Sequence, residues 1–122
     1  MSKHLVLQTD FARADGAVSA MYGVALSVDP ALKIFDLTHE IPQYNIWEAS
    51  YRLYQTVQYW PKGTVFVSVV DPGVGTDRLS VVAQTSDGQY VVTPDNGTLT
   101  HLAESIGIVA VREIDENVNR LP

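Results

Sequence analysis

Four aspartates follow apolar stretches whose composition predicts β-strands. Asp10, Asp36 and Asp71 lie at the ends of such stretches, and Asp95 comes two residues after another. The carboxyl ends of parallel strands meet at one edge of a sheet, where α/β proteins bind ligands, so these carboxylates are expected to converge. Aspartate is also common in turns and helix caps that have no function. That preference favours a structural role for any single one of these residues, but it is less adequate for Asp71.

Asp71 begins the most distinctive segment, DPGVGTDR at residues 71–78. One proline and two glycines fix an unusual backbone path directly after the most apolar predicted strand. Arg78 is close enough in sequence to fold back onto Asp71, and its positive charge would keep that carboxyl group ionised. The pair could serve chemistry, or it could only fasten the loop, since surface ion pairs contribute little to stability.

These carboxylates are compatible with three kinds of function. Clustered aspartates could hold magnesium for phosphoryl transfer. Asp10 could instead accept hydrogen bonds from a ribose diol while Asp71 and Arg78 orient a small nucleophile. A nucleoside-binding module without chemistry would need only the ribose contact, and residue periodicity does not choose among the three.

Other polar and aromatic positions carry weaker signals. Asp15 suits a helix N-cap, and Tyr44 could be a stacking face or a hydrophobic staple before the next helix. Neither a GxGxxG fingerprint nor a Walker A lysine loop is present, so phosphate binding is unsupported. The three histidines have no metal-type spacing, which favours packing or surface roles and no metal site; they are His4, His39 and His101.

Short apolar segments and amphipathic segments alternate along the chain, which predicts βαβ units in a three-layer α/β/α fold. A turn at residues 86–89 predicts one antiparallel hairpin, so the mostly parallel sheet is expected to be mixed. Asn45 should cap the second helix, with Glu48 reaching back to it. The predicted strands are 4–9, 32–37, 64–70, 80–85, 89–93 and 108–114, and the predicted helices are 16–28, 45–60 and 98–106.

Composition limits the class of protein. The 122 residues carry a net charge of −6 and are 46% apolar, which fits one folded domain and argues against nucleic-acid or anionic-membrane partners. The chain has no cysteine, so disulfides, thiolate catalysis and sulfur-bound zinc are excluded. No apolar run predicts a signal peptide or a membrane span, and a cytoplasmic location is the expectation.

Several motifs, in order and with compatible spacing, resemble those of the S-adenosyl-L-methionine hydroxide adenosyltransferases, which are S-adenosylmethionine hydrolases related to fluorinating and chlorinating enzymes. The motifs are TDF at 9–11 with Asp15, DLTH at 36–39, DPGVG at 71–75 with Arg78, and PDNG at 94–97. The resemblance implies attack of water or hydroxide on the 5′ carbon of the adenosyl group, giving adenosine and L-methionine without a cofactor.

The resemblance also implies roles for individual residues. Asp71 and Arg78 match two members of an Asp–Arg–His set that activates the water, and Asp10 matches the residue that holds the ribose hydroxyls. Asp15 matches a position near the methionine amino group, and Tyr44 an aromatic beside the sugar. In the fluorinating relatives a tyrosine replaces Asp71; a carboxylate there repels a halide, which favours hydrolysis over halogenation.

Two departures from the family pattern affect the expectation. Ala12 replaces the glycine that family members carry after Asp-Phe. The family's catalytic histidine and its C-terminal β-barrel domain have no counterpart in residues 1–122, so the chain is expected to be a truncated N-terminal domain. We therefore expect the intact protein to be a hydrolase, as a homotrimer with sites between subunits. The 122-residue piece should be weak or inactive, or simply a nucleoside-binding or structural fragment.

Overall fold

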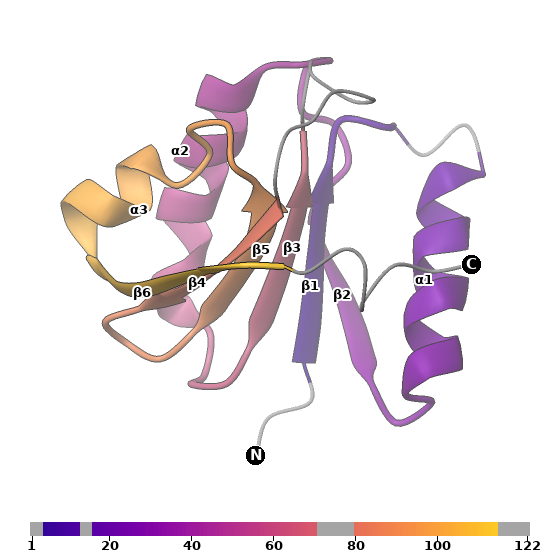
Figure 1. Ribbon diagram of the computed structural model, residues 1–122. Coiled ribbons are helices and arrows are strands. Elements are labelled where there is room, and N and C mark those ends of the chain that lie inside the picture. Colours follow the sequence, from indigo (N-terminus) through magenta and orange to yellow (C-terminus); the bar gives the residue numbers. More distant parts are fainter. Residues whose placement is uncertain (1–3, 13–15, 71–79, 115–122) are drawn as a thin grey trace.

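The computed structural model describes residues 4–12, 16–70 and 80–114. Within these ranges six strands form one mixed sheet in the order β2-β1-β3-β5-β4-β6 (Figure 1). The elements are β1 (His4–Thr9), α1 (Ala17–Val28), β2 (Lys33–Thr38), α2 (Ile46–Thr56), the 3-10 helix η1 (Val57–Tyr59), β3 (Val65–Val69), β4 (Ser80–Thr85), β5 (Tyr90–Pro94), α3 (Thr100–Ser105) and β6 (Ile108–Glu113).

The sheet is mixed because only β4 runs against its neighbours. β1 pairs in parallel with β2 and β3, and β3 pairs in parallel with β5, whereas β4 is antiparallel to both β5 and β6. The β4–β5 hairpin predicted at residues 86–89 is thus confirmed. The predicted α/β/α class is confirmed as well, with each predicted strand lying within one or two residues of its observed bounds.

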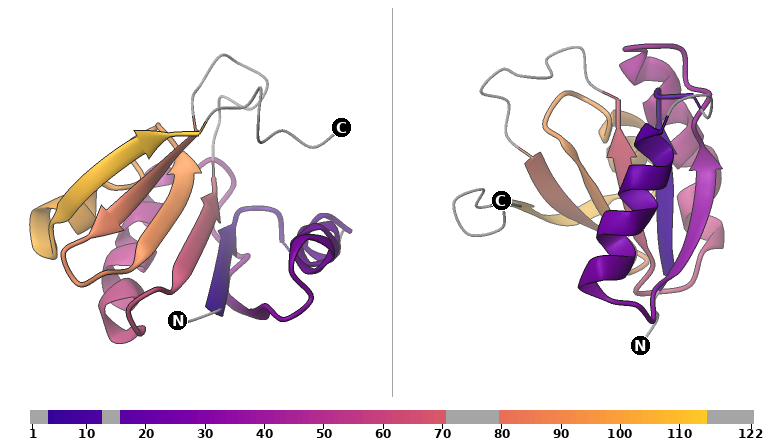
Figure 2. Two further views of the ribbon diagram at one scale, coloured as in Figure 1. Left: turned by 60° about the horizontal axis from the view of Figure 1, so that its bottom comes forward. Right: turned by 90° about the vertical axis from the view of Figure 1, so that its right-hand side faces the viewer.

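Helices cover both faces of the sheet (Figures 1 and 2). On one face, Leu53 of α2 and Leu102 of α3 pack on Val6, Phe66 and Val91, all of them buried. On the other face, α1 lies over β1 and β3 across an apolar hollow of about 350 Å³, lined by Leu5, Leu7, Ala20, Met21, Val24, Ala25 and Val67. The main core of the described residues therefore lies between the sheet and α2, with α1 packed more loosely.

Helix α2 starts as predicted and ends early. The Asn45 side chain accepts a hydrogen bond from the Glu48 N–H at 3.0 Å, which is the expected N-cap. Glu48 does not reach back, because its carboxylate pairs with Arg52 at 2.7 Å while the Asn45 N–H donates to the Pro42 carbonyl. From Val57 the chain tightens into η1, so the predicted single helix over 45–60 is an α-helix followed by a 3-10 turn.

The connections put a topological switch point at β1. The chain leaves β1 through α1 to reach β2 on one side, then crosses through α2 to β3 on the other side of β1. Because βαβ crossovers are right-handed, the two helices lie on opposite faces of the sheet. The chain enters α1 from the carboxyl end of β1 and α2 from the carboxyl end of β2. Such a division opens the crevice where α/β proteins bind ligands.

Candidate active site

Asp10 follows the last residue of β1, at this switch point. Its Oδ2 accepts a hydrogen bond of 2.7 Å from the Tyr44 N–H, which lies just before α2. From the described residues, the other oxygen, Oδ1, receives no hydrogen bond, and the side chain is only partly exposed. Asp10 therefore joins the loops after β1 and β2 and keeps one oxygen for a further donor.

Two non-glycine residues beside this carboxylate have left-handed backbone conformations. Ala12, two positions after Asp10, has a φ of 58°, and Tyr44 has a φ of 64°. Each N–H has a long-range partner: Ala12 donates to the His39 carbonyl at 2.9 Å and Tyr44 donates to Asp10. Left-handed backbone costs an L-residue about 1–2 kcal/mol, and such strain concentrates at functional sites.

Tyr44 is the residue to which the resemblance assigns the role of an aromatic beside the sugar. Its side chain is about half exposed, and its N–H is the donor to Asp10. Asp10 and Tyr44 are thus brought together although 34 positions separate them in sequence. The half-exposed phenol ring offers an apolar surface and the Asp10 carboxylate a hydrogen-bond acceptor. A ribose could meet the first with its ring face and the second with its hydroxyl groups.

Below Asp10, a buried histidine bridges the ends of β1 and β2. His39 Nδ1 lies 2.8 Å from Thr9 Oγ1, and its Nε2 lies 2.6 Å from Asp36 Oδ1. The predicted packing role of His39 is correct in that its side chain is fully buried. Sequence reasoning did not connect it with Asp10; the only signals were its spacing of three from Asp36 and its DLTH motif.

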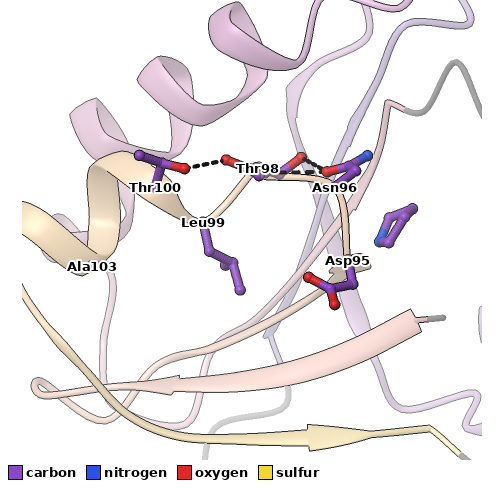
Figure 3. Close-up of a pocket in the computed structure, with 8 residues that line it drawn as sticks. Asp95, Asn96, Thr98, Leu99, Thr100 and Ala103 are labelled. Carbon is purple, nitrogen blue, oxygen red and sulfur yellow. Dashed lines mark hydrogen bonds between the residues drawn. The ribbon is translucent and has the colours of Figure 1, made fainter. Parts of the chain in front are cut away.

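The turn after β5 forms the other side of this sheet edge. Asn96 Nδ2 donates to the Val70 carbonyl at 2.8 Å, which ties the turn to the end of β3, and Asn96 Oδ1 accepts from the Thr98 N–H and Oγ1. Exposed Asp95 and the half-buried Leu99 border a pocket of about 220 Å³ (Figure 3). Asp95 thus lies at the edge where the strand-end acids were expected.

Three of the predicted site residues, Asp15, Asp71 and Arg78, lie outside the described residues. Of the four strand-end aspartates, the structure describes Asp10, Asp36 and Asp95, so the predicted convergence can be compared with the structure for these three. Of these, Asp36 is hydrogen-bonded through Oδ1 to the buried His39. In the described ranges, no group of three or more His, Cys, Asp or Glu side chains is placed to hold a metal ion.

The comparisons with known proteins decide the family. Residues 5–121 match the family model of the SAM hydroxide adenosyltransferase N-terminal domain. The chain belongs to this family. The resemblance noted in the sequence is thereby confirmed, over nearly the full length of the chain.

Several relatives of this SAM hydroxide adenosyltransferase domain are named (R)-S-adenosyl-L-methionine hydrolases. The one from Methanocaldococcus jannaschii is 41% identical over 116 residues, covering 92% of this chain and 44% of the relative. The one from Salinispora tropica is 39% identical, covering 92% of this chain and 41% of the relative. The chain thus spans less than half the length of these relatives.

A more distant relative and a solved structure are consistent with this family. A fluorinase from Actinoplanes is 24% identical over 132 residues, well below the hydrolases. The crystal structure of an uncharacterized conserved protein from Thermotoga maritima superposes with a TM-score of 0.89 at 39% identity, covering 92% of this chain and 43% of that one. None of the helices in the described parts has the length and apolar character that a membrane crossing requires.

Proposed function

We propose that the intact protein, whether it is this chain or a longer one with residues 1–122 as its N-terminal domain, hydrolyses (R)-S-adenosyl-L-methionine to adenosine and L-methionine. The observation that carries this proposal is the family match over residues 5–121 together with relatives of that name at about 40% identity. The (R) label refers to the sulfonium centre, so the proposal includes the choice between two sulfur epimers.

In this proposal Asp10 binds the ribose. Its Oδ1 accepts hydrogen bonds from the ribose hydroxyls, while the Tyr44 N–H holds Oδ2 and fixes the plane of the carboxylate. Hydrogen bonds to a charged acceptor are about twice as strong as neutral ones, which makes a single carboxylate an effective anchor for a diol. The Tyr44 ring would pack beside the sugar, and Asp15 would lie near the methionine amino group.

The reaction step is a substitution at the 5′ carbon. The oxygen of water or hydroxide forms a bond to this carbon as the carbon–sulfur bond breaks. The electron pair of that bond goes to sulfur, which becomes the thioether of methionine, and an attacking water also gives up one proton to the solvent. When hydroxide attacks, the cationic sulfonium and the anion disappear together, so a dry site does not oppose the step. Arg78 would favour the hydroxide form and Asp71 would orient both, with no metal or cofactor taking part.

The same residues favour hydrolysis over halogenation. The carboxylate of Asp71 would repel a fluoride or chloride ion at the position of the nucleophile. Fluorinases are also more distant relatives, at 24% identity for the Actinoplanes protein, than the hydrolases. We further propose a homotrimer, as the family implies. The cytoplasmic location and the weak activity of the isolated 122 residues stay predictions.

The deciding experiment incubates the intact protein with each sulfonium epimer in heavy-oxygen water and chloride, and analyses nucleosides and methionine by mass spectrometry. From the (R) epimer we expect adenosine that carries the heavy oxygen and methionine that does not, with loss of both products in Asp71→Ala and Arg78→Ala. Arg52→Ala is the matched control. Among the described residues the Arg52 guanidinium pairs with Glu48 and Gln55 of α2, so its removal should leave turnover unchanged. No adenosine from either epimer, or a chlorinated nucleoside as the main product, would overturn the proposal.

A further inference from the structure

The buried His39 is connected to the loop that carries Asp10 by both its side chain and its backbone. Its Nδ1 is 2.8 Å from Thr9 Oγ1, and its carbonyl accepts the Ala12 N–H at 2.9 Å. Thr9 and Ala12 flank Asp10 on its two sides. His39 thus contacts the chain before and after Asp10. Its side chain is 0% exposed and does not reach the surface.

The hydrogen bonds through His39 have one consistent direction. An ionised Asp36 only accepts, so His39 Nε2 is the donor in the 2.6 Å contact with Oδ1. The neutral ring then accepts at Nδ1 from the Thr9 hydroxyl, and that hydroxyl accepts from the Phe11 N–H at 3.2 Å. In this tautomer each donor in the chain from Phe11 to Asp36 has an acceptor.

This chain of hydrogen bonds spans an irregularity in the sheet. The register between β1 and β2 shifts at Leu7 and Gln8, so that Leu7 pairs with Asp36 and Gln8 with Thr38. Bulges bend a strand and redirect side chains next to active sites. The contact between Asp36 and His39 lies beside this irregularity, and His39 in turn contacts Thr9, the residue directly before Asp10.

We propose that Asp36, His39 and Thr9 act together as a positioning relay that aims the Asp10 carboxylate. This inference rests on the proposed function for its ligand, the ribose of an adenosyl group. The relay holds the backbone on both sides of Asp10, and the strained Tyr44 holds Oδ2, so Oδ1 has one direction left in which to meet a ribose hydroxyl. None of the three residues touches the substrate, so they are positioning residues and not catalytic ones.

A second hydroxyl–imidazole pair, elsewhere in the chain, serves as a control that distinguishes a positioning role from a purely structural one. Ser50 Oγ lies 2.7 Å from His101 Nδ1 and accepts the His101 N–H, which ties α2 to α3. This second hydroxyl–imidazole pair also has a buried hydroxyl, but it contacts neither the Asp10 loop nor Tyr44. Ser50→Ala should cost stability as Thr9→Val does, while leaving the Asp10 carboxylate in place.

The test compares Thr9→Val, Thr9→Ser, Asp36→Asn and Ser50→Ala with the unchanged intact protein. One readout is the Tyr44 amide resonance, which reports the hydrogen bond to Asp10 without any ligand. The other is the ratio of affinities for adenosine and 2′,3′-dideoxyadenosine, which lacks the diol. We expect Thr9→Val to move the Tyr44 resonance and to reduce that ratio about 10-fold, the typical value of one charge-assisted hydrogen bond.

The conservative and control variants complete the prediction. Thr9→Ser keeps the hydroxyl and should restore both readouts, Asp36→Asn should change them in the same direction to a smaller extent, and Ser50→Ala should change neither. The relay is refuted if folded Thr9→Val or Asp36→Asn keeps the original Tyr44 resonance. If the unchanged protein does not distinguish adenosine from its dideoxy analogue, the proposed function fails, and the Tyr44 resonance still decides on the relay.

Discussion

The Asp10 carboxylate accepts a 2.7 Å hydrogen bond from the backbone N–H of Tyr44, which lies 34 positions further along the chain. This contact joins the loop after β1 to the start of α2 across the switch point of the sheet. Among the described residues, Oδ1 of Asp10 receives no hydrogen bond, and Asp10 lies at the strand end beside the switch point. The relationship gives Asp10 a defined orientation before any ligand arrives, which lowers the cost of binding.

The first prediction concerns this carboxylate. Asp10→Asn keeps the size of the side chain and an acceptor for the Tyr44 N–H, but it replaces the charged acceptor of the ribose hydroxyls. We expect the dissociation constant for adenosine to rise about 10-fold or more, since hydrogen bonds to charged groups contribute roughly 1.5–3 kcal/mol. Calorimetric titration measures this change.

The control for Asp10→Asn is Asp87→Asn. Asp87 is exposed in the β4–β5 turn, at the opposite end of the sheet from Asp10. The Asp87→Asn variant should therefore bind adenosine as the unchanged protein does. Equal affinities for the Asp10 variant and the unchanged protein would remove Asp10 from the ribose site.

Much of the fold could be predicted because its signals are local. The strands are short apolar runs bounded by turn residues, and Asn45 caps α2 as its type and position indicate. The backbone of Ala12 and Tyr44 could not be predicted, since an L-residue has no local preference for a positive φ. The compensating hydrogen bonds come from Asp10 and His39, whose proximity depends on the folded sheet.

The candidate site also has one part that local sequence predicts and one part that depends on the folded sheet. Asp10 and Tyr44 were named from motifs, and the structure brings them into contact. For His39 the sequence predicts only a packing or surface role, because a histidine without metal-type spacing carries no local signal of its partners. Its link to Thr9 and Asp36 arises from the pairing of β1 with β2, a long-range property that the order of residues does not display.

A second prediction follows from the left-handed backbone of Ala12. With a φ of 58°, Ala12 has a conformation that glycine adopts without strain. Ala12→Gly should relieve about 1–2 kcal/mol of backbone strain in the folded state. The greater conformational freedom of glycine in the unfolded chain offsets part of this gain, so the free energy of unfolding should rise by roughly 0.5–1 kcal/mol. Urea denaturation followed by circular dichroism measures it.

The comparison for Ala12 is Ala20→Gly, within α1. Ala20 is exposed and helical, so the same chemical change should lower the free energy of unfolding by about 1 kcal/mol. Destabilisation of similar size in both variants would show that the Ala12 backbone is not left-handed in solution.

A third prediction sets two glycines against each other. Gly107 has a φ of 96°, and a Cβ there would lie 2.7 Å from Ser86 Oγ. Gly107→Ala should therefore lower the free energy of unfolding by about 1–3 kcal/mol. Gly23 lies inside α1 with open space around it, so Gly23→Ala should raise the same quantity by about 0.5–1 kcal/mol. Thermal melting of the two variants should shift in opposite directions; a shared direction would contradict the structure at one of them.

The fourth prediction separates the hydrolase from a metal-dependent phosphoryl transferase, the other chemistry that strand-end aspartates suggest. A magnesium site needs several carboxylate oxygens that face the ion. Asp10 has one oxygen engaged by the Tyr44 N–H and Asp36 has one engaged by His39, so each offers at most one further oxygen. Formation of adenosine should therefore be unchanged by prolonged dialysis against EDTA, measured by chromatography before and after. A magnesium-dependent phosphatase treated in the same buffer should lose its activity, which verifies the chelation. Loss of adenosine formation that added magnesium restores would assign the strand-end carboxylates to a metal.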